Sequence, residues 1–286
     1  MVKVKIIGGL GNQMFQYATA KALAVKHNTE VSANISAFSS YEVHPLSIDK
    51  LSCKCKFDSR GDFLSKMLDF SYFRKTFSKF SHFFNVHIEK DLSYNAELFN
   101  SDIGVSLFGY FQSEKYFLNI RELLLEEFSL SAPLAKHEAT IENRITESDS
   151  VAIHIRRGDY ISNKSANSVH GTCENDYFIN ALSNLKKSNL LSDATVLFIF
   201  SDDIEWCQDN LSFEYQTVFV KGSSDRPEVD IHLMSKCKHQ IISNSTFSWW
   251  GAWLNTNPNK CVIAPLQWFK TLHDSTDIVP EQWKRL

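Results

Sequence analysis

The sequence predicts an α/β protein made of two halves, each with a parallel sheet covered by helices. Short β-rich runs alternate with helical patterns along most of the chain, which favours crossover connections between parallel strands. The pattern pauses at residues 129–133 and then starts again, and a length of 286 residues suits two compact halves. We therefore expect two Rossmann-like halves facing a cleft (a GT-B-like arrangement), with one domain over residues 1–135 and another over 148–286.

The first half begins with a run typical of a buried strand, Val2 to Ile7, which breaks at a glycine-rich segment. A helical pattern follows over residues 12–27. Further along, residues 31–35 and 105–108 indicate strands and residues 114–128 indicate a helix. The segment 63–84 places phenylalanines at helical spacing among basic residues. This segment either buries its apolar face or rests peripherally on an anionic membrane.

The second half repeats the strand-then-helix order more regularly. Its predicted strands are residues 150–155, 195–200, 217–220, 240–242 and 261–264. Its predicted helices are residues 135–147, 176–187, 203–211, 227–236 and 247–255.

Composition excludes several classes of protein. The 30 Lys and Arg against 33 Asp and Glu give a formal charge of −3, which argues against a nucleic-acid binder. No apolar run approaches the ~20 residues that span a bilayer, and the N-terminus lacks a signal-peptide pattern. The 6 cysteines form no CxxC pair and no zinc spacing. These features predict a cytoplasmic protein with reduced thiols.

Three polar clusters follow strands of the second half, at the carboxyl edge where parallel sheets bind ligands. The first, His154 to Tyr160, contains the adjacent arginines Arg156 and Arg157. Arginine suits bidentate binding of phosphate oxygens, and the alternative is an Arg–Asp ion pair that braces a turn at Gly158.

The second cluster is Ser201-Asp202-Asp203. Its carboxylates can accept hydrogen bonds from a ribose or a guanine, or a side chain here caps the next helix. The third cluster, Ser243 to Gly251, offers hydroxyls and N–H groups at a helix start, which either bind an anion or only cap the helix. Together the three clusters would line one crevice suited to a nucleoside diphosphate.

Other nucleotide motifs are absent or incomplete. Gly9-Leu10-Gly11-Asn12-Gln13-Met14 imitates a dinucleotide fingerprint, but Met14 takes the position of the third glycine. There is no P-loop and no DxD triplet, and the ExD pair Glu228 and Asp230 lies inside a predicted helix. Arginine and helix-end charge would therefore replace a metal beside a diphosphate, and we expect no metal and no cofactor.

These clusters, taken with an N-terminal segment, resemble the alpha-1,2-fucosyltransferases of glycosyltransferase family 11. The segments that carry the resemblance are Gly8–Ala18, His154–Tyr160, Ser201–Asp203 and Ser243–Leu254. The resemblance implies a metal-independent, inverting enzyme that moves L-fucose from GDP-fucose to the 2-hydroxyl of a galactose-terminated glycan, in bacterial O-antigen or other surface-glycan synthesis. It also implies that residues 1–135 form the acceptor side and residues 148–286 bind GDP-fucose.

The resemblance further implies a role for individual residues. Arg156 would hold the diphosphate, with Arg157 assisting or bracing the loop, and Asn12 would approach the fucose or phosphate from the other half. His154 and either Asp202 or Asp203 would contact guanosine. Hydroxyls near the third cluster's helix start would reach phosphate oxygens: Ser245, Thr246 and Ser248.

Three side chains are candidates for the base that deprotonates the acceptor: Asp159, His170 and Glu174. The sequence does not choose among them, and a base is dispensable if GDP departure runs ahead of attack. Two other functions stay open at this point. One is a different GDP-sugar transferase, such as a protein O-fucosyltransferase. The other is a carbohydrate-binding module, although Trp249, Trp250 and Trp253 have the helical spacing of a core.

Overall fold

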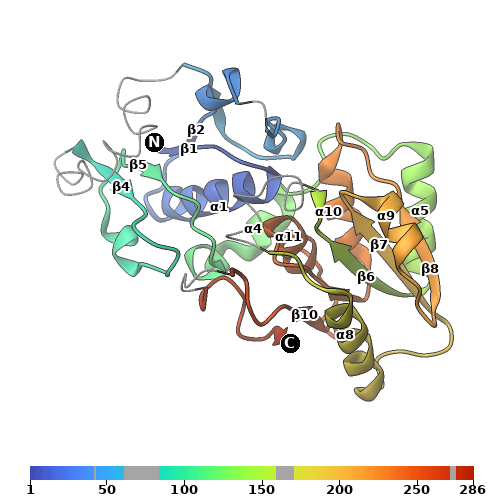
Figure 1. Cartoon of the computed structure of the whole chain (residues 1–286). Helices are drawn as coiled ribbons and strands as arrows, with labels where there is room; N and C mark the ends of the chain where they lie inside the picture. Colours follow the sequence, from blue (N-terminus) through green and yellow to red (C-terminus); the bar gives the residue numbers. More distant parts are fainter. Residues whose placement is uncertain (42, 61–83, 159–170, 271–274) are drawn as a thin grey trace. The chain divides into compact units, whose positions relative to one another are not determined.

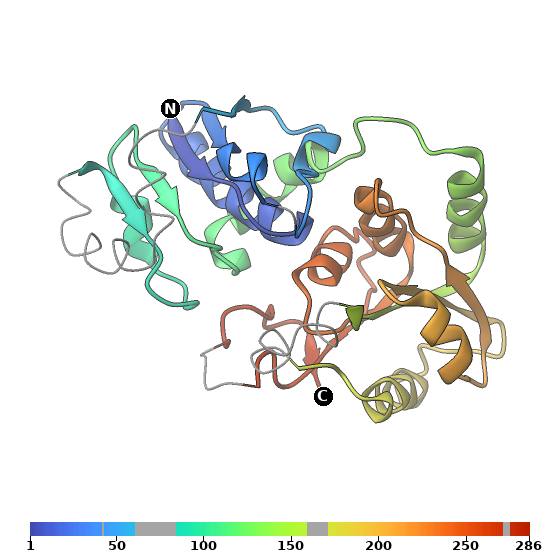
Figure 2. The same cartoon turned by 45° about the horizontal axis from the view of Figure 1, so that its top comes forward.

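The computed structural model describes residues 1–41, 43–60, 84–158, 171–270 and 275–286 (Figures 1 and 2). The chain divides into two compact units. Unit 1 comprises Met1–Ser129 with Thr276–Ile278, and unit 2 comprises Leu130–Ser275 with Val279–Leu286. Each unit contains one parallel sheet, so the predicted α/β class with two such halves is confirmed.

Unit 1 has a five-stranded parallel sheet of order β3-β2-β1-β5-β4. Its strands are β1 (Val2–Lys5), β2 (Val31–Asn34), β3 (Lys56–Asp58), β4 (Val86–Ile88) and β5 (Ser106–Phe108). The outer strands β3 and β4 were not predicted, because their sequences, KFD and VHI, contain no two adjacent apolar residues.

The helix α1 (Leu10–Lys26) follows β1 and packs on β1 and β2. Its residues from Leu10 to Ala24 are nearly all buried, whereas Val25, which the helical pattern placed on the inner face, is 46% exposed. Gly8, with a φ of 82°, makes the turn between β1 and α1.

The region predicted as one helix over residues 114–128 is broken into shorter pieces. They are η5 (Glu114–Tyr116), η6 (Leu118–Ile120) and α4 (Arg121–Glu127). The break lies at Phe117, whose φ of −141° is not helical and whose ring is buried 5.9 Å from that of Phe15. Packing of this ring outweighs continuation of the helix. The other short helical turns of unit 1 are η1 (Ser36–Ser39), η2 (Ile48–Lys50) and η4 (Ala96–Asn100).

Unit 2 has a six-stranded parallel sheet of order β11-β10-β9-β6-β7-β8. Its strands are β6 (Asp149–Ile155), β7 (Thr195–Ser201), β8 (Gln216–Val220), β9 (His239–Ile241), β10 (Val262–Ala264) and β11 (Lys284–Arg285). Its helices are α5 (Lys136–Glu147), α8 (Asn175–Lys187), α9 (Ile204–Asn210), α10 (Pro227–Lys236) and α11 (Thr246–Trp253). The five strands predicted in this half are confirmed to within a residue or two, and the two-residue strand β11 was not predicted.

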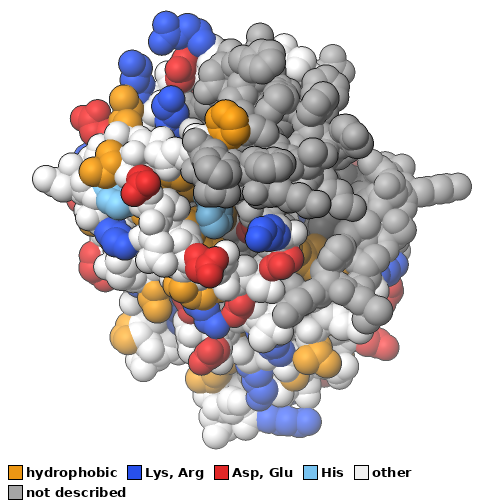
Figure 3. Space-filling model, turned by 90° about the vertical axis from the view of Figure 1, so that its left-hand side faces the viewer, with side chains coloured by type: hydrophobic (Ala, Val, Ile, Leu, Met, Phe, Trp, Pro, Cys, Tyr) orange, Lys and Arg blue, Asp and Glu red, His pale blue; other side chains and the backbone are white. Residues whose placement is uncertain are grey.

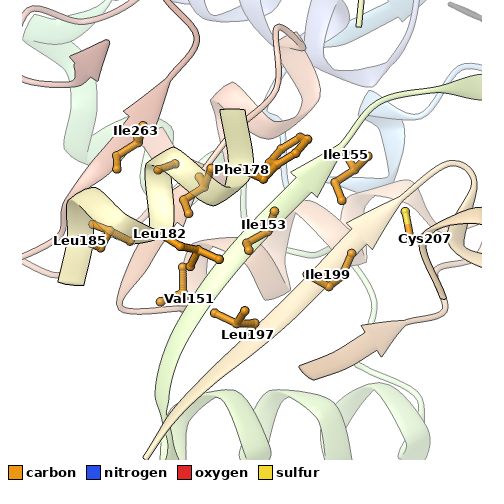
Figure 4. Close-up of a cluster of buried hydrophobic side chains, with 12 residues drawn as sticks. Val151, Ile153, Ile155, Phe178, Leu182, Leu185, Leu197, Ile199, Cys207 and Ile263 are labelled. Atoms are coloured by element: carbon orange, nitrogen blue, oxygen red, sulfur yellow. The ribbon is translucent and has the colours of Figure 1, made fainter. Parts of the chain in front are cut away.

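Both faces of this sheet are covered by helices. On one face, side chains of α8 and α9 pack on Val151, Ile153 and Leu197 of the central strands (Figure 4). On the other face, α10 packs against α5 and α11 (Figures 1 and 2). The middle parts of β6 and β7 are apolar runs, residues 151–153 and 196–200, because neither face of the sheet meets water there.

The tryptophans of α11 belong to the core, as their helical spacing predicted. Trp249, Trp250 and Trp253 are at most 2% exposed, and the rings of Trp249 and Trp253 stack with centroids 6.0 Å apart. Trp283 joins them, 5.4 Å from Trp249. This packing fixes α11, whose first residues belong to the third polar cluster.

The surface seen over β4 and β5 mixes charges of both signs, with hydrophobic side chains scattered singly in its described part (Figure 3). In the parts of the chain described, no helix is both long and apolar enough to cross a membrane. Residues 63–83 of the predicted basic aromatic segment lie outside the described ranges, and Phe84 at its end is 59% exposed.

Candidate functional site

The three polar clusters lie side by side at the carboxyl edge of the unit 2 sheet. They follow β6, β7 and β9, which are neighbours in the order β9-β6-β7. Hydrogen bonds join the clusters: the Ser243 hydroxyl donates to the His154 carbonyl at 2.6 Å, and the Arg157 N–H donates to Asp202 at 2.9 Å. The sequence-based expectation of one shared crevice edge is therefore matched by the positions of these clusters.

Arg156 is the first residue after β6, and its guanidinium is oriented by an acid from the next strand. Its Nη1 lies 2.9 Å from Oδ2 of Asp202, and both side chains are about one-fifth exposed, 20% and 23%. The Arg156 N–H also donates to the Ser243 hydroxyl at 3.3 Å. Backbone and side chain of Arg156 are thus held from both neighbouring strands, and a partly buried guanidinium faces the edge where anions bind.

Arg157 is held by different partners. Its guanidinium carbon lies 3.3 Å from the ring centroid of Trp206, a cation–π contact, and its Nε is 3.7 Å from Asp203. Asp203 also accepts a hydrogen bond from the Trp206 N–H at 3.3 Å and caps α9. This geometry favours a bracing role for Arg157 and a capping role for Asp203, two of the readings that the sequence left open.

Gly158 follows the two arginines and lies close to Asp202. A Cβ at this position would lie 2.8 Å from Asp202 Oδ2, closer than side-chain packing permits. A glycine therefore lets the carboxylate reach both arginines. Asp159, His170 and the other residues between 159 and 170 lie outside the described ranges, so two of the candidate bases have no structural account here. The third, Glu174, is exposed at the start of α8.

His154 is buried at the end of β6, with 3% of its surface exposed. The pKa of its imidazole is lowered to about 4, chiefly by burial and also by the charge of Arg156, with Asp202 opposing both. Its Nδ1 accepts or donates no hydrogen bond within the described residues, and its ring lies 5.7 Å from that of Phe247. A neutral histidine with an unsatisfied nitrogen is an unusual feature for a core and is more typical of a site.

The third cluster contains hydroxyls in two different situations. Ser245 caps α11 by accepting from the Phe247 N–H at 3.3 Å, and Thr246 is half-buried as the first residue of the helix. The Ser248 hydroxyl is fully buried and donates to the Ser245 carbonyl at 3.3 Å. This geometry gives Ser248 a structural hydrogen bond inside the helix, whereas Ser245 and Thr246 stand at the helix start where an anion is stabilised.

Asn12, the predicted residue from the other half, lies in unit 1 at the start of α1. Its Oδ1 accepts from Nε2 of Gln112 at 2.9 Å. The glutamines beside it in the motif tie loops together: Gln13 bonds to Gly8 and Ser47, and Gln16 bonds to Ile7 and Gly109. The motif that imitates a dinucleotide fingerprint is therefore a set of buried amides that fixes the carboxyl edge of the unit 1 sheet.

Sequence reasoning missed an acidic cluster at the start of α10, beside β8 at the same edge of unit 2. Burial, together with the charges of Glu138 and Glu228, raises the pKa of Asp230 to about 7. Arg226 pairs with Glu138 at 2.6 Å and with Glu228 at 3.4 Å. The ExD spacing of Glu228 and Asp230 suggests only a metal motif, and their closeness to Glu138 is a tertiary contact that the sequence does not show. Among the described side chains, no group of three or more His, Cys, Asp and Glu is arranged to hold a metal ion.

The class of protein follows from the fold. The structure of a mutant of Arabidopsis thaliana FUT1 in complex with GDP has a TM-score of 0.53 and 12% identity, over 91% of this chain and 69% of that one. The structure of NodZ alpha-1,6-fucosyltransferase co-crystallised with GDP has a TM-score of 0.50 and 13% identity, over 88% and 91%. At such low identity these likenesses concern the fold alone, which is that of GT-B glycosyltransferases.

The particular family follows from the sequence. The family described as Glycosyl transferase family 11 matches residues 1–285, and the chain therefore belongs to glycosyltransferase family 11. An alpha-1,2-colitosyltransferase of Escherichia coli is 36% identical over 299 residues, 100% of this chain and 99% of the relative. The O-antigen biosynthesis glycosyltransferase WbnK of Escherichia coli is 30% identical over 315 residues, 98% of both chains. Galactoside 2-alpha-L-fucosyltransferase SEC1 of Bos taurus is 28% identical over 157 residues, 52% of this chain and 42% of the relative. The predicted family is confirmed, and with it a catalytic glycosyltransferase and not a carbohydrate-binding module.

Proposed function

We propose that this glycosyltransferase moves L-fucose from GDP-fucose to the 2-hydroxyl of a galactose residue, with inversion and without a metal. The observation that carries the donor assignment is the arginine pair at the carboxyl edge of unit 2, oriented by Asp202 beside the start of α11. Two guanidinium groups and a helix N-terminus supply the positive charge that a nucleoside diphosphate requires.

In this proposal Arg156 is the principal catalytic residue. As GDP departs, negative charge grows on the β-phosphate oxygen, and a guanidinium already held by Asp202 stabilises that charge without reorganising. Arg157, braced against Trp206, keeps the loop in place. The neutral His154 and a carboxylate of the second cluster contact the guanosine. The first hydroxyls of α11 donate hydrogen bonds to the phosphates.

GDP-colitose is a second candidate donor, because a relative that is 36% identical along the whole chain is an alpha-1,2-colitosyltransferase. Colitose is the 3-deoxy form of L-fucose, so the two donors differ at a single hydroxyl. A site built to hydrogen-bond that hydroxyl rejects the deoxy sugar strongly, whereas a site without such a partner discriminates weakly. For the acceptor we propose the galactose end of a surface glycan, in line with the O-antigen relative.

A donor panel with one acceptor tests the function. The chain is incubated with a terminal β-galactoside and with GDP-fucose, GDP-colitose or GDP-mannose in the presence of EDTA, and the product linkage is determined by NMR. We expect an α-1,2-linked product from GDP-fucose, and a higher rate with GDP-colitose would reassign the donor. Transfer to another hydroxyl, or dependence on added metal, would contradict the proposal.

The arginine assignment has a matched control. Arg156→Ala is expected to lower kcat by ~10²–10³ while the protein stays folded, because one preorganised contact to the leaving group is lost. Arg144→Ala removes an exposed arginine of α5 in the same unit and is expected to leave turnover unchanged. Normal turnover by a folded Arg156→Ala variant would contradict the assignment of Arg156 as the principal catalytic residue.

A further inference from the structure

A partly buried carboxylate lies at the carboxyl edge of the unit 1 sheet, in a segment without any sequence motif. Glu89 follows β4, and its two oxygens accept hydrogen bonds from the N–H groups of Tyr110 at 2.6 Å and Phe111 at 2.8 Å. Those residues follow β5, the strand beside β4. One side chain therefore holds the loop that leaves the neighbouring strand.

The loop over residues 109–112 is shaped around Glu89. A Cβ on Gly109 would lie 2.4 Å from the Cβ of Glu89, so only glycine allows this approach. Phe111 has a φ of 54°, in the left-handed region that a residue with a large side chain rarely adopts, and its ring is completely buried. A strained residue of this kind persists only where its surroundings fix it, and Glu89 supplies two of the fixing hydrogen bonds.

The same loop continues to the motif at the start of α1. The residue after Phe111 is Gln112, whose Nε2 donates to Oδ1 of Asn12 at 2.9 Å. Gln16 donates to the Gly109 carbonyl at 3.1 Å, so α1 grips the loop at both ends. Glu89 is thus connected to Asn12 across the ends of β4, β5 and β1 by a hydrogen bond to Phe111, the backbone from Phe111 to Gln112, and the hydrogen bond from Gln112.

We propose that Glu89 is a positioning residue of the transferase: its carboxylate sets the 109–112 loop and, through Gln112, the amide of Asn12. The inference rests on the proposed function and on the role that the family resemblance implies for Asn12, which is to approach the transferred sugar or the phosphate. Glu89 touches no reacting atom in this proposal. It acts by fixing the amide that does, and a displacement of ~1 Å at such a group lowers turnover by up to ~10²-fold.

The protonation state of Glu89 gives the proposal a specific signature. The pKa of Glu89 is raised to about 7. Burial is the main cause, the charge of Asp91 adds to it, and the two N–H groups oppose it. Among the described residues, the other titratable groups near it include Tyr116, whose pKa it helps to raise, the adjacent Lys90, and His87, whose ring lies 6.1 Å from that of Phe111. A protonated Glu89 loses acceptor capacity for the loop, so turnover should fall as pH drops below about 7.

The test compares Glu89→Gln, Glu89→Asp and Glu89→Ala with Glu30→Gln, which makes the same neutralisation at an exposed glutamate before β2, at the opposite edge of the sheet. We expect Glu89→Gln to lower kcat for transfer about tenfold and Glu89→Ala about 10²-fold. The Kd for GDP, which reports on unit 2, should change less than about twofold. The acid limb of kcat should be present in the wild type and Glu89→Asp and absent from Glu89→Gln.

An activity-independent measurement separates this inference from the proposed function. Hydrogen exchange of the Tyr110 and Phe111 amides should accelerate at least about tenfold in Glu89→Gln and be unchanged in Glu30→Gln, because only the first loses an accepted hydrogen bond. Unchanged exchange in Glu89→Gln, or an unaltered kcat and acid limb in an active enzyme, would overturn the proposal. If the wild type transfers no sugar, the proposed function fails, and the exchange result still decides whether Glu89 sets the loop.

Discussion

Asp202 binds the side chain of Arg156 and the backbone of Arg157 with its two carboxylate oxygens. Oδ2 lies 2.9 Å from Nη1 of Arg156, and Oδ1 accepts from the Arg157 N–H at 2.9 Å. The sequence offered Asp202 as a guanosine contact or as a helix cap, and the neighbouring Asp203 takes the cap. Asp202 therefore orients both the side chain of Arg156 and the backbone of Arg157.

Asp202→Asn tests this orienting role. The amide oxygen can still accept one hydrogen bond, but the ion pair with Arg156 is lost, so the guanidinium is less well oriented for the departing phosphate. We expect kcat to fall by about 10²-fold with the KM for donor changed much less, measured by release of GDP. Asp209→Asn on the exposed end of α9 is the control. A variant in which KM rises and kcat is kept would point to nucleotide contact as the main role of Asp202.

Gly158→Ala should damage the same relationship from the other side. The new Cβ would meet Asp202 Oδ2 at 2.8 Å, so the loop or the carboxylate must move. We expect kcat to fall about tenfold without loss of folding. A double-mutant cycle with Asp202→Ala measures whether the two act as a unit, because the second substitution should then add little to the first. Fully additive effects would mean that Gly158 matters for a reason other than Asp202.

The hydroxyls at the start of α11 are predicted to separate into two groups. Ser248→Ala removes a buried hydrogen bond to the Ser245 carbonyl and should lower the unfolding free energy by about 1 kcal/mol, with GDP affinity unchanged. Thr246→Val removes a hydroxyl at the helix start and should raise the Kd for GDP roughly tenfold with little effect on stability. Calorimetric titration and thermal unfolding of both variants distinguish these outcomes, and the reverse pattern would refute the division.

The long central strands could be predicted from the sequence because they are buried on both faces and contain apolar runs, residues 151–153 in β6 and 196–200 in β7. The strands β3 and β4 contain no two adjacent apolar residues and so carry too little pattern. The helix over residues 114–128 is broken by the burial of Phe117, a tertiary effect. Packing decides such cases, and a single sequence does not contain the packing partner.

The site was predicted where a motif and a strand end coincide, as at Arg156 and Asp202. Which of two chemically reasonable roles a residue takes depends on a contact, and so the capping by Asp203 and the burial of Ser248 required the structure. The role of Glu89 could not be predicted from the sequence, because its partners are backbone N–H groups and these do not depend on residue type.

Asp230→Asn should stabilise the protein in a pH-dependent manner. Burial and the charges of Glu138 and Glu228 raise the pKa of Asp230 from 3.8 to about 7 in the folded state. Since the folded pKa lies above the unfolded one, the stability that this carboxyl contributes is complete below about pH 4 and is lost as pH rises to about 7.

Asparagine resembles the protonated acid and carries no charge at any pH, so the variant avoids this loss. We expect its Tm to exceed that of the wild type by about 4–8 °C at pH 8. This corresponds to a difference of roughly 2 kcal/mol in the free energy of unfolding, a value reduced because Asp230 is partly exposed. The gap should close towards pH 4. Asp193→Asn, at an exposed position before β7, should show no gap at either pH. Differential scanning calorimetry between pH 4 and 8 measures both variants, and a constant Tm difference across that range would show that the charge of Asp230 is not the cause.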